Sequence, residues 1–92
     1  NAQFELGVSY FRGIGVTQDY LKALDWFNKA DAQGHARAKT YIASSYYELG
    51  VMYAEGKRVP ENEEKAIEWF TKAAKNGNKD AQVLLNELEI QY

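Results

Sequence analysis

The sequence contains no cysteine and only one proline, Pro60, among its 92 residues. Without cysteine there is no disulfide framework and no thiolate metal site. Scarce proline permits long uninterrupted helices, so the seven glycines are expected to mark most of the breaks between them. No apolar run approaches the length of about 18 residues that a membrane-spanning helix needs, so membrane insertion is not expected.

An excess of charge of one sign is lacking as well. Eleven basic and thirteen acidic side chains give a net charge of −2, which offers no electrostatic reason to bind nucleic acid. An apolar content of 46% excludes intrinsic disorder. Because the chain starts at Asn1 with neither an initiator methionine nor a signal peptide, we expect an excised segment, and the sequence does not indicate its compartment.

The chain repeats itself with an offset of 43 residues. When residues 4–38 are laid on residues 47–81, 15 of 35 positions are identical, whereas about two would match by chance. Periods of about 20 to 50 residues are typical of stacked supersecondary units, each of which buries its apolar face against its neighbours. The sequence therefore predicts a stack of repeated units.

Each unit is predicted to hold two helices separated by glycines. The first helix ends at Gly13 in one unit and Gly56 in the other, and the second helix ends at Gly34 and Gly77. An apolar stripe at helical spacing recurs on the second helix: Ala23, Trp26, Phe27 and Ala30, then Ala66, Trp69, Phe70 and Ala73. Good N-caps precede it at Asp19 and Asn62, and ion pairs at i and i+4 are expected for Asp25–Lys29 and Glu68–Lys72.

Gly7 and Gly50 occupy matching positions on the first helix of each unit. Because glycine has no Cβ, we expect the second helix to approach the backbone of the first closely at these points. The space between the layers is expected to be filled by the aromatic side chains of the second helices: Trp26, Phe27, Trp69 and Phe70.

This set of positions resembles the Sel1-like repeat, a relative of the tetratricopeptide repeat. The matching residues are Leu6, Gly7, Tyr10, Gly13, Gly15, Val16, Asp19, Lys22, Ala23, Trp26, Phe27, Lys29, Ala30, Gly34 and Ala38, with a second copy from Leu49 to Ala81. The resemblance implies an all-α, right-handed solenoid of antiparallel helix pairs in the order A-B-A-B-A. It also implies a scaffold or adaptor that binds a protein or peptide, without a cofactor or catalysis of its own.

Ten residues separate Ala38 from Leu49 in the second unit, whereas three separate Ala2 from Leu6 in the first. The second unit therefore has seven extra residues. Seven residues are nearly two helical turns, which predicts one long helix from about Ala36 to Glu55. The expected organisation is one domain over 1–92, with a first repeat at about 2–37, a second at about 38–80 and a closing helix at about 81–92.

The extra turns bring several aromatic and aliphatic side chains: Tyr41, Ile42, Tyr46 and Tyr47. This is more apolar surface than an exposed overhang normally carries. Three interpretations remain open, namely a longer local core, a homo-oligomer or domain-swap contact through Tyr41, Ile42 and Tyr46, and a ledge that binds a partner.

Residues suited to catalysis or metal binding are nearly absent. His35 is the only histidine, and no serine or cysteine nucleophile motif accompanies it, so a capping or solvent-exposed role is expected. Glu61, Glu63 and Glu64 are explained by the start of a helix, where negative charge is favourable. We expect no catalytic residue, no cofactor and no metal, and an enzyme fragment is a distant alternative.

A second apolar stripe lies on the first helices: Phe4, Val8 and Phe11, then Tyr47, Val51 and Ala54. It is explained either by packing against the adjacent first helix or by a groove on the concave face that binds a peptide or helix. The residues predicted to contact a partner are Phe4, Val8, Phe11, Arg12, Tyr47, Glu48, Val51 and Glu55. A clamp for the C-terminal carboxylate of a partner, as in some tetratricopeptide proteins, uses several basic residues on the first helices. Only Arg12 is placed for that here, so such a clamp is not expected. Self-association through the extended helix is the alternative function.

We expect the substitution Trp69→Ala to lower the free energy of unfolding by about 3–5 kcal/mol, because it removes a large aromatic side chain from the predicted core. A thermal melt measures the effect, and an unchanged melting temperature would contradict the core assignment.

Overall fold

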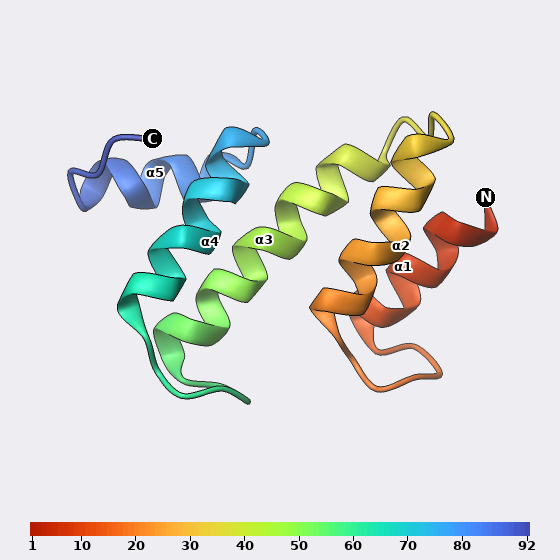
Figure 1. The fold of residues 1–92 in the computed structure, drawn as a ribbon, viewed down its shortest axis with the longest axis horizontal. Helices are drawn as coiled ribbons and strands as arrows, with labels where there is room; N and C mark the ends of the chain where they lie inside the picture. Colours follow the sequence, from red (N-terminus) through yellow and green to blue (C-terminus); the bar gives the residue numbers. More distant parts are fainter.

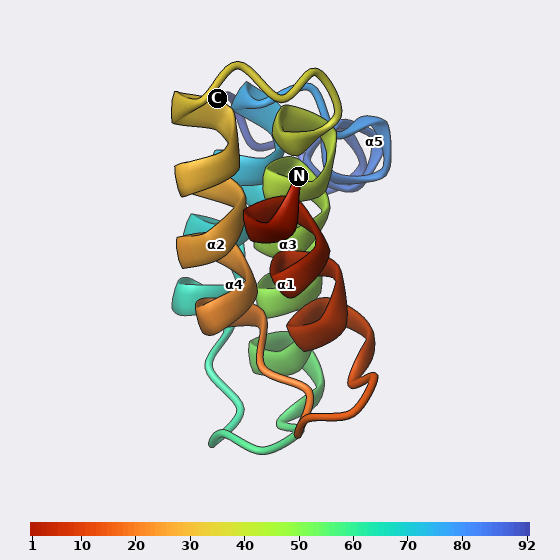
Figure 2. The ribbon, with the colours of Figure 1, turned by 90° about the vertical axis from the view of Figure 1, so that its right-hand side faces the viewer.

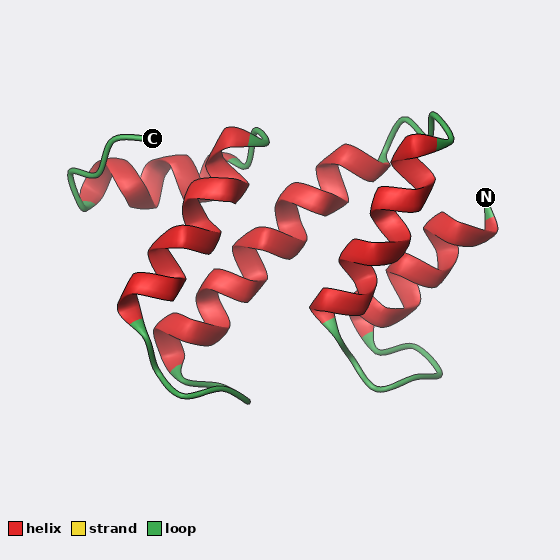
Figure 3. Ribbon diagram, in the orientation of Figure 1, coloured by secondary structure: helices red, strands yellow, loops and turns green.

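A computed structural model describes all 92 residues and contains five α-helices and no strand (Figures 1 and 3). The helices are α1 (Ala2–Arg12), α2 (Tyr20–Ala32), α3 (Ala38–Glu55), α4 (Glu63–Lys75) and α5 (Lys79–Glu87). The prediction of an all-α chain with the order A-B-A-B-A is confirmed. None of the helices combines the length and the apolar character needed to cross a bilayer.

The helices form two layers. Figure 2 shows α2 and α4 on one side and α1, α3 and α5 on the other. Each helix packs against the next one along the chain, which is the arrangement of an α-solenoid. The resulting slab measures 39 × 27 × 14 Å, so every layer has one face on the core and one face open to solvent.

Short polar side chains and glycines set the limits of the helices as predicted. Asp19 and Asn62 cap α2 and α4, and each side chain accepts a backbone N–H of the first turn at 3.0 Å. Helices α1 and α3 end at Gly13 and Gly56, whose φ values of 72° and 69° lie in the left-handed region that favours glycine. The turn that joins the two helices is therefore built in the same way in both units.

The closest approach within each unit lies between a glycine and a phenylalanine ring. A Cβ on Gly7 would lie 2.5 Å from the ring of Phe27, and a Cβ on Gly50 would lie 2.6 Å from the ring of Phe70. Both rings are buried. The expected close contact is therefore present twice, and it fixes the separation of the paired helices.

The two tryptophans occupy matching positions but different surroundings. Trp69 packs against the core cluster of the first unit and stacks on Tyr46, with 5.8 Å between ring centroids. Trp26 packs against neither core cluster, because α1 and α2 form one end of the stack (Figure 1). The prediction that Trp26 fills the space between layers is therefore wrong. Leu6 also lies at the end of the stack. It is 40% exposed, whereas its counterpart Leu49 in the second unit is 4% exposed.

The lysines of the second helices lie over the tryptophan rings. Lys29 Nζ is 4.5 Å from the ring centroid of Trp26, and Lys72 Nζ is 4.8 Å from that of Trp69. The predicted ion pairs Asp25–Lys29 and Glu68–Lys72 do not form, and the one ion pair of the structure lies elsewhere. A cation over an aromatic face at a partly exposed site gains about as much as an exposed ion pair, so the ring competes successfully.

Helix α3 is the long helix that the sequence predicts, although it begins at Ala38 and not at Ala36. Ile42 is buried in the first core cluster at 6% exposure, and Tyr41 and Tyr46 pack against that cluster. The extra turns thus extend the local core, which accounts for their apolar side chains. A self-association contact through the same three residues would have to use side chains that already pack inside the chain.

The closing helix is shorter than predicted. The sequence predicts a helix over about 81–92, but α5 ends at Glu87. Glu89 takes a left-handed conformation with φ of 58°, and the backbone N–H of Ile90 donates to the carbonyl oxygen of Leu85 at 2.9 Å. These features end the helix and return Ile90 to the second core cluster.

The substitution Gly50→Ala is expected to lower the free energy of unfolding by about 1–3 kcal/mol, because the added methyl group would overlap the buried ring of Phe70. Urea denaturation measures the loss. Combining it with Phe70→Leu should recover part of the loss, and a Gly50→Ala protein as stable as the wild type would contradict the close contact.

Trp26→Ala is the matched control for Trp69→Ala. Because Trp26 packs against neither core cluster, its loss is expected to cost clearly less than the loss of Trp69 in the same thermal melt. Equal losses would show that the end of the stack is as tightly packed as its middle.

Candidate partner-binding groove

The part of the predicted groove that belongs to the first unit is filled. The ring of Phe11 lies 5.4 Å from that of Tyr20, 5.7 Å from that of Tyr41 and 6.2 Å from that of Phe27, measured between centroids. Arg12 donates a hydrogen bond to the hydroxyl of Tyr41 at 3.3 Å. An aromatic cluster therefore closes the space that the sequence predicts to receive a partner.

Phe4 does not belong to an open groove. It is 6% exposed and lies in the first core cluster, between the rings of Tyr41 and His35. The prediction that Phe4 contacts a partner does not fit this burial, because the ring of Tyr41 from the lengthened α3 covers it. His35 stacks on Phe4 with 4.0 Å between ring centroids, and its Nδ1 accepts the backbone N–H of Arg37. Helix α3 has no side-chain cap at its N-terminus, so His35 packs on Phe4 and does not cap the helix.

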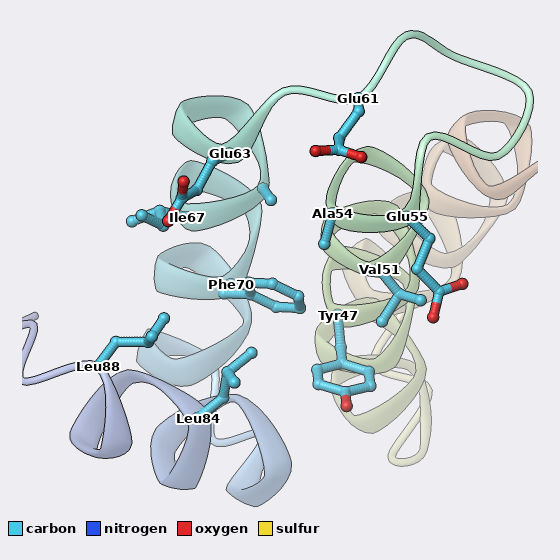
Figure 4. Close-up of a pocket in the computed structure, with 11 residues that line it drawn as sticks. Tyr47, Val51, Ala54, Glu55, Glu61, Glu63, Ile67, Phe70, Leu84 and Leu88 are labelled. Atoms are coloured by element: carbon cyan, nitrogen blue, oxygen red, sulfur yellow. The ribbon is translucent and has the colours of Figure 1, made fainter.

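The part that belongs to the second unit is open. A cavity of about 380 Å³ lies where α3, α4 and α5 meet, and in Figure 4 the ring of Phe70 points from α4 toward α3. Tyr47, Val51 and Glu55 of the predicted set line it. The sequence did not point to the apolar lining residues on α4 and at α5, where Leu88 is the C-cap: Ala66, Ile67, Phe70, Leu84 and Leu88. We call this cavity and its rim the groove.

Three substitutions between the repeats explain why only the second unit is open. At the offset of 43, Ala54 stands in the place of Phe11, Glu63 in the place of Tyr20 and Leu84 in the place of Tyr41. Each replaces an aromatic ring of the filled cluster with a smaller or charged side chain. The direction of α5 adds to the effect, since it turns away from α4, whereas α3 runs along α2 (Figure 1).

Carboxylates line the rim of the groove. Glu55, Glu61 and Glu63 contribute to its lining, and the carboxylate of Glu61 lies over the opening in Figure 4. Glu55 pairs with Lys57 at 3.1 Å, and both side chains are half-exposed or more. Glu61 and Glu63 form no ion pair. The rim therefore carries uncompensated negative charge.

The pKa of the Tyr47 hydroxyl is raised mainly by burial. The carboxylates of Asp80, Glu48 and Glu55 raise it further, because nearby negative charge disfavours the tyrosinate form. Of these three carboxylates only Glu55 belongs to the rim.

Among the predicted site residues of the second unit, Glu48 alone does not line the groove. Its side chain faces the first unit and lies beside the hydroxyl of Tyr20. Burial raises the pKa of the Glu48 carboxyl, the Tyr20 hydroxyl offsets part of the rise, and Glu55 adds to it. Glu48 thus belongs to the junction between the units and not to the opening.

The groove has the chemistry of a docking site for an apolar side chain. Its volume lies in the range of about 300–1,000 Å³ that is usual for ligand pockets, and its walls are mainly hydrophobic. No group of three or more histidine, aspartate or glutamate side chains is arranged to hold a metal ion.

Stability is expected to fall as the pH rises through the titration of Glu48. Because the folded-state pKa is raised, the folded chain keeps a proton that the unfolded chain has already released, and ionisation disfavours folding. Denaturant unfolding from about pH 4 upward should show a smaller decline for Glu48→Gln than for the wild type. Parallel pH curves for the two proteins would contradict a raised pKa.

The sequence of this chain is similar to those of known repeat proteins. The sequence model of the Sel1 repeat matches residues 1–35 and 43–78. A search among curated proteins gives no match. Among solved structures, a protective antigen present in uropathogenic Escherichia coli strains and displaying an SLR fold is 40% identical, and the match covers 88% of this chain with a TM-score of 0.48.

The present chain spans 16% of the length of that antigen. The two matched segments of the family model contain both helix pairs, α1–α2 and most of α3 with α4. They also contain the glycine and phenylalanine positions at which the paired helices meet. The chain therefore belongs to the Sel1 repeat family.

Proposed function

We propose that this chain is a protein interaction module that binds a peptide or helix of a partner protein in the groove between α3, α4 and α5. The observation that carries the proposal is the contrast between the two units. The same scaffold encloses a packed aromatic cluster in the first unit and an open apolar cavity in the second.

The family supports this role. Sel1 repeats are generally protein–protein interaction modules and are typically non-catalytic. We propose no catalytic activity for this chain, since the features shared by its two repeats, the two helical glycines and the phenylalanine rings that they contact, act in packing. The binding residues proposed are three from the sequence prediction together with four on the other helices: Tyr47, Val51, Glu55, Ile67, Phe70, Leu84 and Leu88.

Self-association through the extended helix receives less support. Its side chains Tyr41 and Tyr46 pack against the first core cluster, and Ile42 is part of it. The exposed apolar side chains of the groove lie on the opposite part of the chain, around Leu84 and Leu88. A separate partner protein is therefore better supported as the occupant of the groove than a second copy that binds through Tyr41, Ile42 and Tyr46.

Photo-crosslinking at the groove tests the proposal. A diazirine amino acid in place of Leu88, which lies at the edge of the groove and is 48% exposed, should give a discrete protein adduct when the full protein is produced in its own cells. Val83 provides the matched control, because it lies on α5, of which Leu88 is the C-cap, is 55% exposed and does not line the groove. Adducts from both positions alike, or from neither, would contradict binding at the groove.

A further inference from the structure

The filled cluster of the first unit shows what the groove of the second unit lacks. Phe11 packs between Tyr20 and Tyr41, and the residue 43 positions later is Ala54, whose side chain ends at Cβ. Ala54 lines the groove beside Val51 and Phe70. The largest side chain missing from the second unit is therefore an aromatic ring.

The first unit also shows what kind of element covers this face. Helix α3 runs over α1 and α2, and its Tyr41, Tyr46 and Met52 pack against the first core cluster. Helix α5 has only nine residues and turns away from α4 (Figure 1). The corresponding face of α3 and α4 is thus covered in part, and a further helical segment would complete it.

The rim differs between the units in charge. Arg12, Gln18 and Tyr20 surround the filled cluster, whereas the equivalent positions around the groove hold Glu55, Glu61 and Glu63. No lysine or arginine lines the groove, and Lys57 pairs with only one of the three carboxylates. A segment that enters the groove would therefore meet a negative rim, and positive charge on its flank would complement that rim.

We propose that the groove binds an amphipathic helical segment of a partner protein through one aromatic side chain flanked by lysine or arginine. The ring occupies the space beside Ala54 that Phe11 fills in the first unit, and the basic side chain faces Glu61 and Glu63. Aromatic anchors in desolvated pockets carry much of the energy of protein interfaces, while rim charges act mainly on specificity and association rate. This inference rests on the proposed function, to which it adds the chemistry of the partner.

A displayed library of helical peptides tests the proposal directly. The wild-type protein serves as bait, and the variant Ala54→Phe serves as counter-bait, since its added ring fills the groove. Clones that bind the wild type and not the variant are expected to share one aromatic residue with lysine or arginine three or four positions away. Binding of a selected peptide should weaken about tenfold or more when its aromatic residue becomes alanine.

Two further variants serve as controls. Ala32→Phe adds the same ring on an exposed part of α2 and should bind the selected peptides as the wild type does. Glu61→Gln with Glu63→Gln removes the negative rim without adding bulk, and it should weaken binding several-fold and reduce its dependence on salt. A thermal melt shows whether Ala54→Phe folds. If it does not, the effect of Glu61→Gln with Glu63→Gln on peptide binding still tests the proposal.

The outcomes separate this inference from the proposed function. Groove-dependent clones with aliphatic anchors or acidic flanks would overturn the inference and leave the groove as a binding site. An absence of groove-dependent clones, together with no adduct from Leu88, would overturn both. Methyl NMR signals of Val51 and Ile67 that change with protein concentration, or on Tyr92→Ala, would show that a second copy or the chain's own end fills the groove, which also overturns the inference.

Discussion

The contact between a glycine and a phenylalanine ring is the constraint on which the rest of the structure depends. Gly7 receives Phe27 and Gly50 receives Phe70, and in each pair a single added carbon would overlap the ring. The contact fixes the distance between the paired helices, and that distance sets the width of the space on the neighbouring face. Both units therefore offer the same frame, and the side chains placed around the frame decide whether the space is filled or open.

The two units use this frame differently. In the first unit Phe11 and Tyr41 complete an aromatic cluster under the lengthened α3. In the second unit Ala54 and Leu84 leave the cavity open. A repeat can accept such changes without loss of fold, since each unit contacts only its neighbours and the glycine–phenylalanine contact is kept. Both units keep a buried core, and only the second leaves an apolar cavity beside it.

Much of this architecture could be predicted from the sequence, because caps, glycines and apolar spacing act locally. The helix starts at Asp19 and Asn62 and the close approach at Gly50 follow from such rules. Surroundings that depend on a neighbouring unit could not be predicted in this way. Trp26 and Trp69 have similar local sequences, yet only Trp69 packs against another unit. The groove was predicted in part, through Tyr47, Val51 and Glu55, whereas its walls on α4 and α5 depend on the direction that α5 takes after Asn78.

The central claim is that the space enclosed by the first unit is filled and that the equivalent space of the second unit is open. A small aromatic amine tests this claim most directly. Benzylamine combines a ring for the space beside Ala54 with a cation for the acidic rim. Titration followed by methyl NMR should shift the signals of Val51, Ile67 and Leu84 in the second unit and leave Val8 and Leu24 in the first unit unchanged. Equal shifts in both units, or shifts confined to the first, would contradict the account.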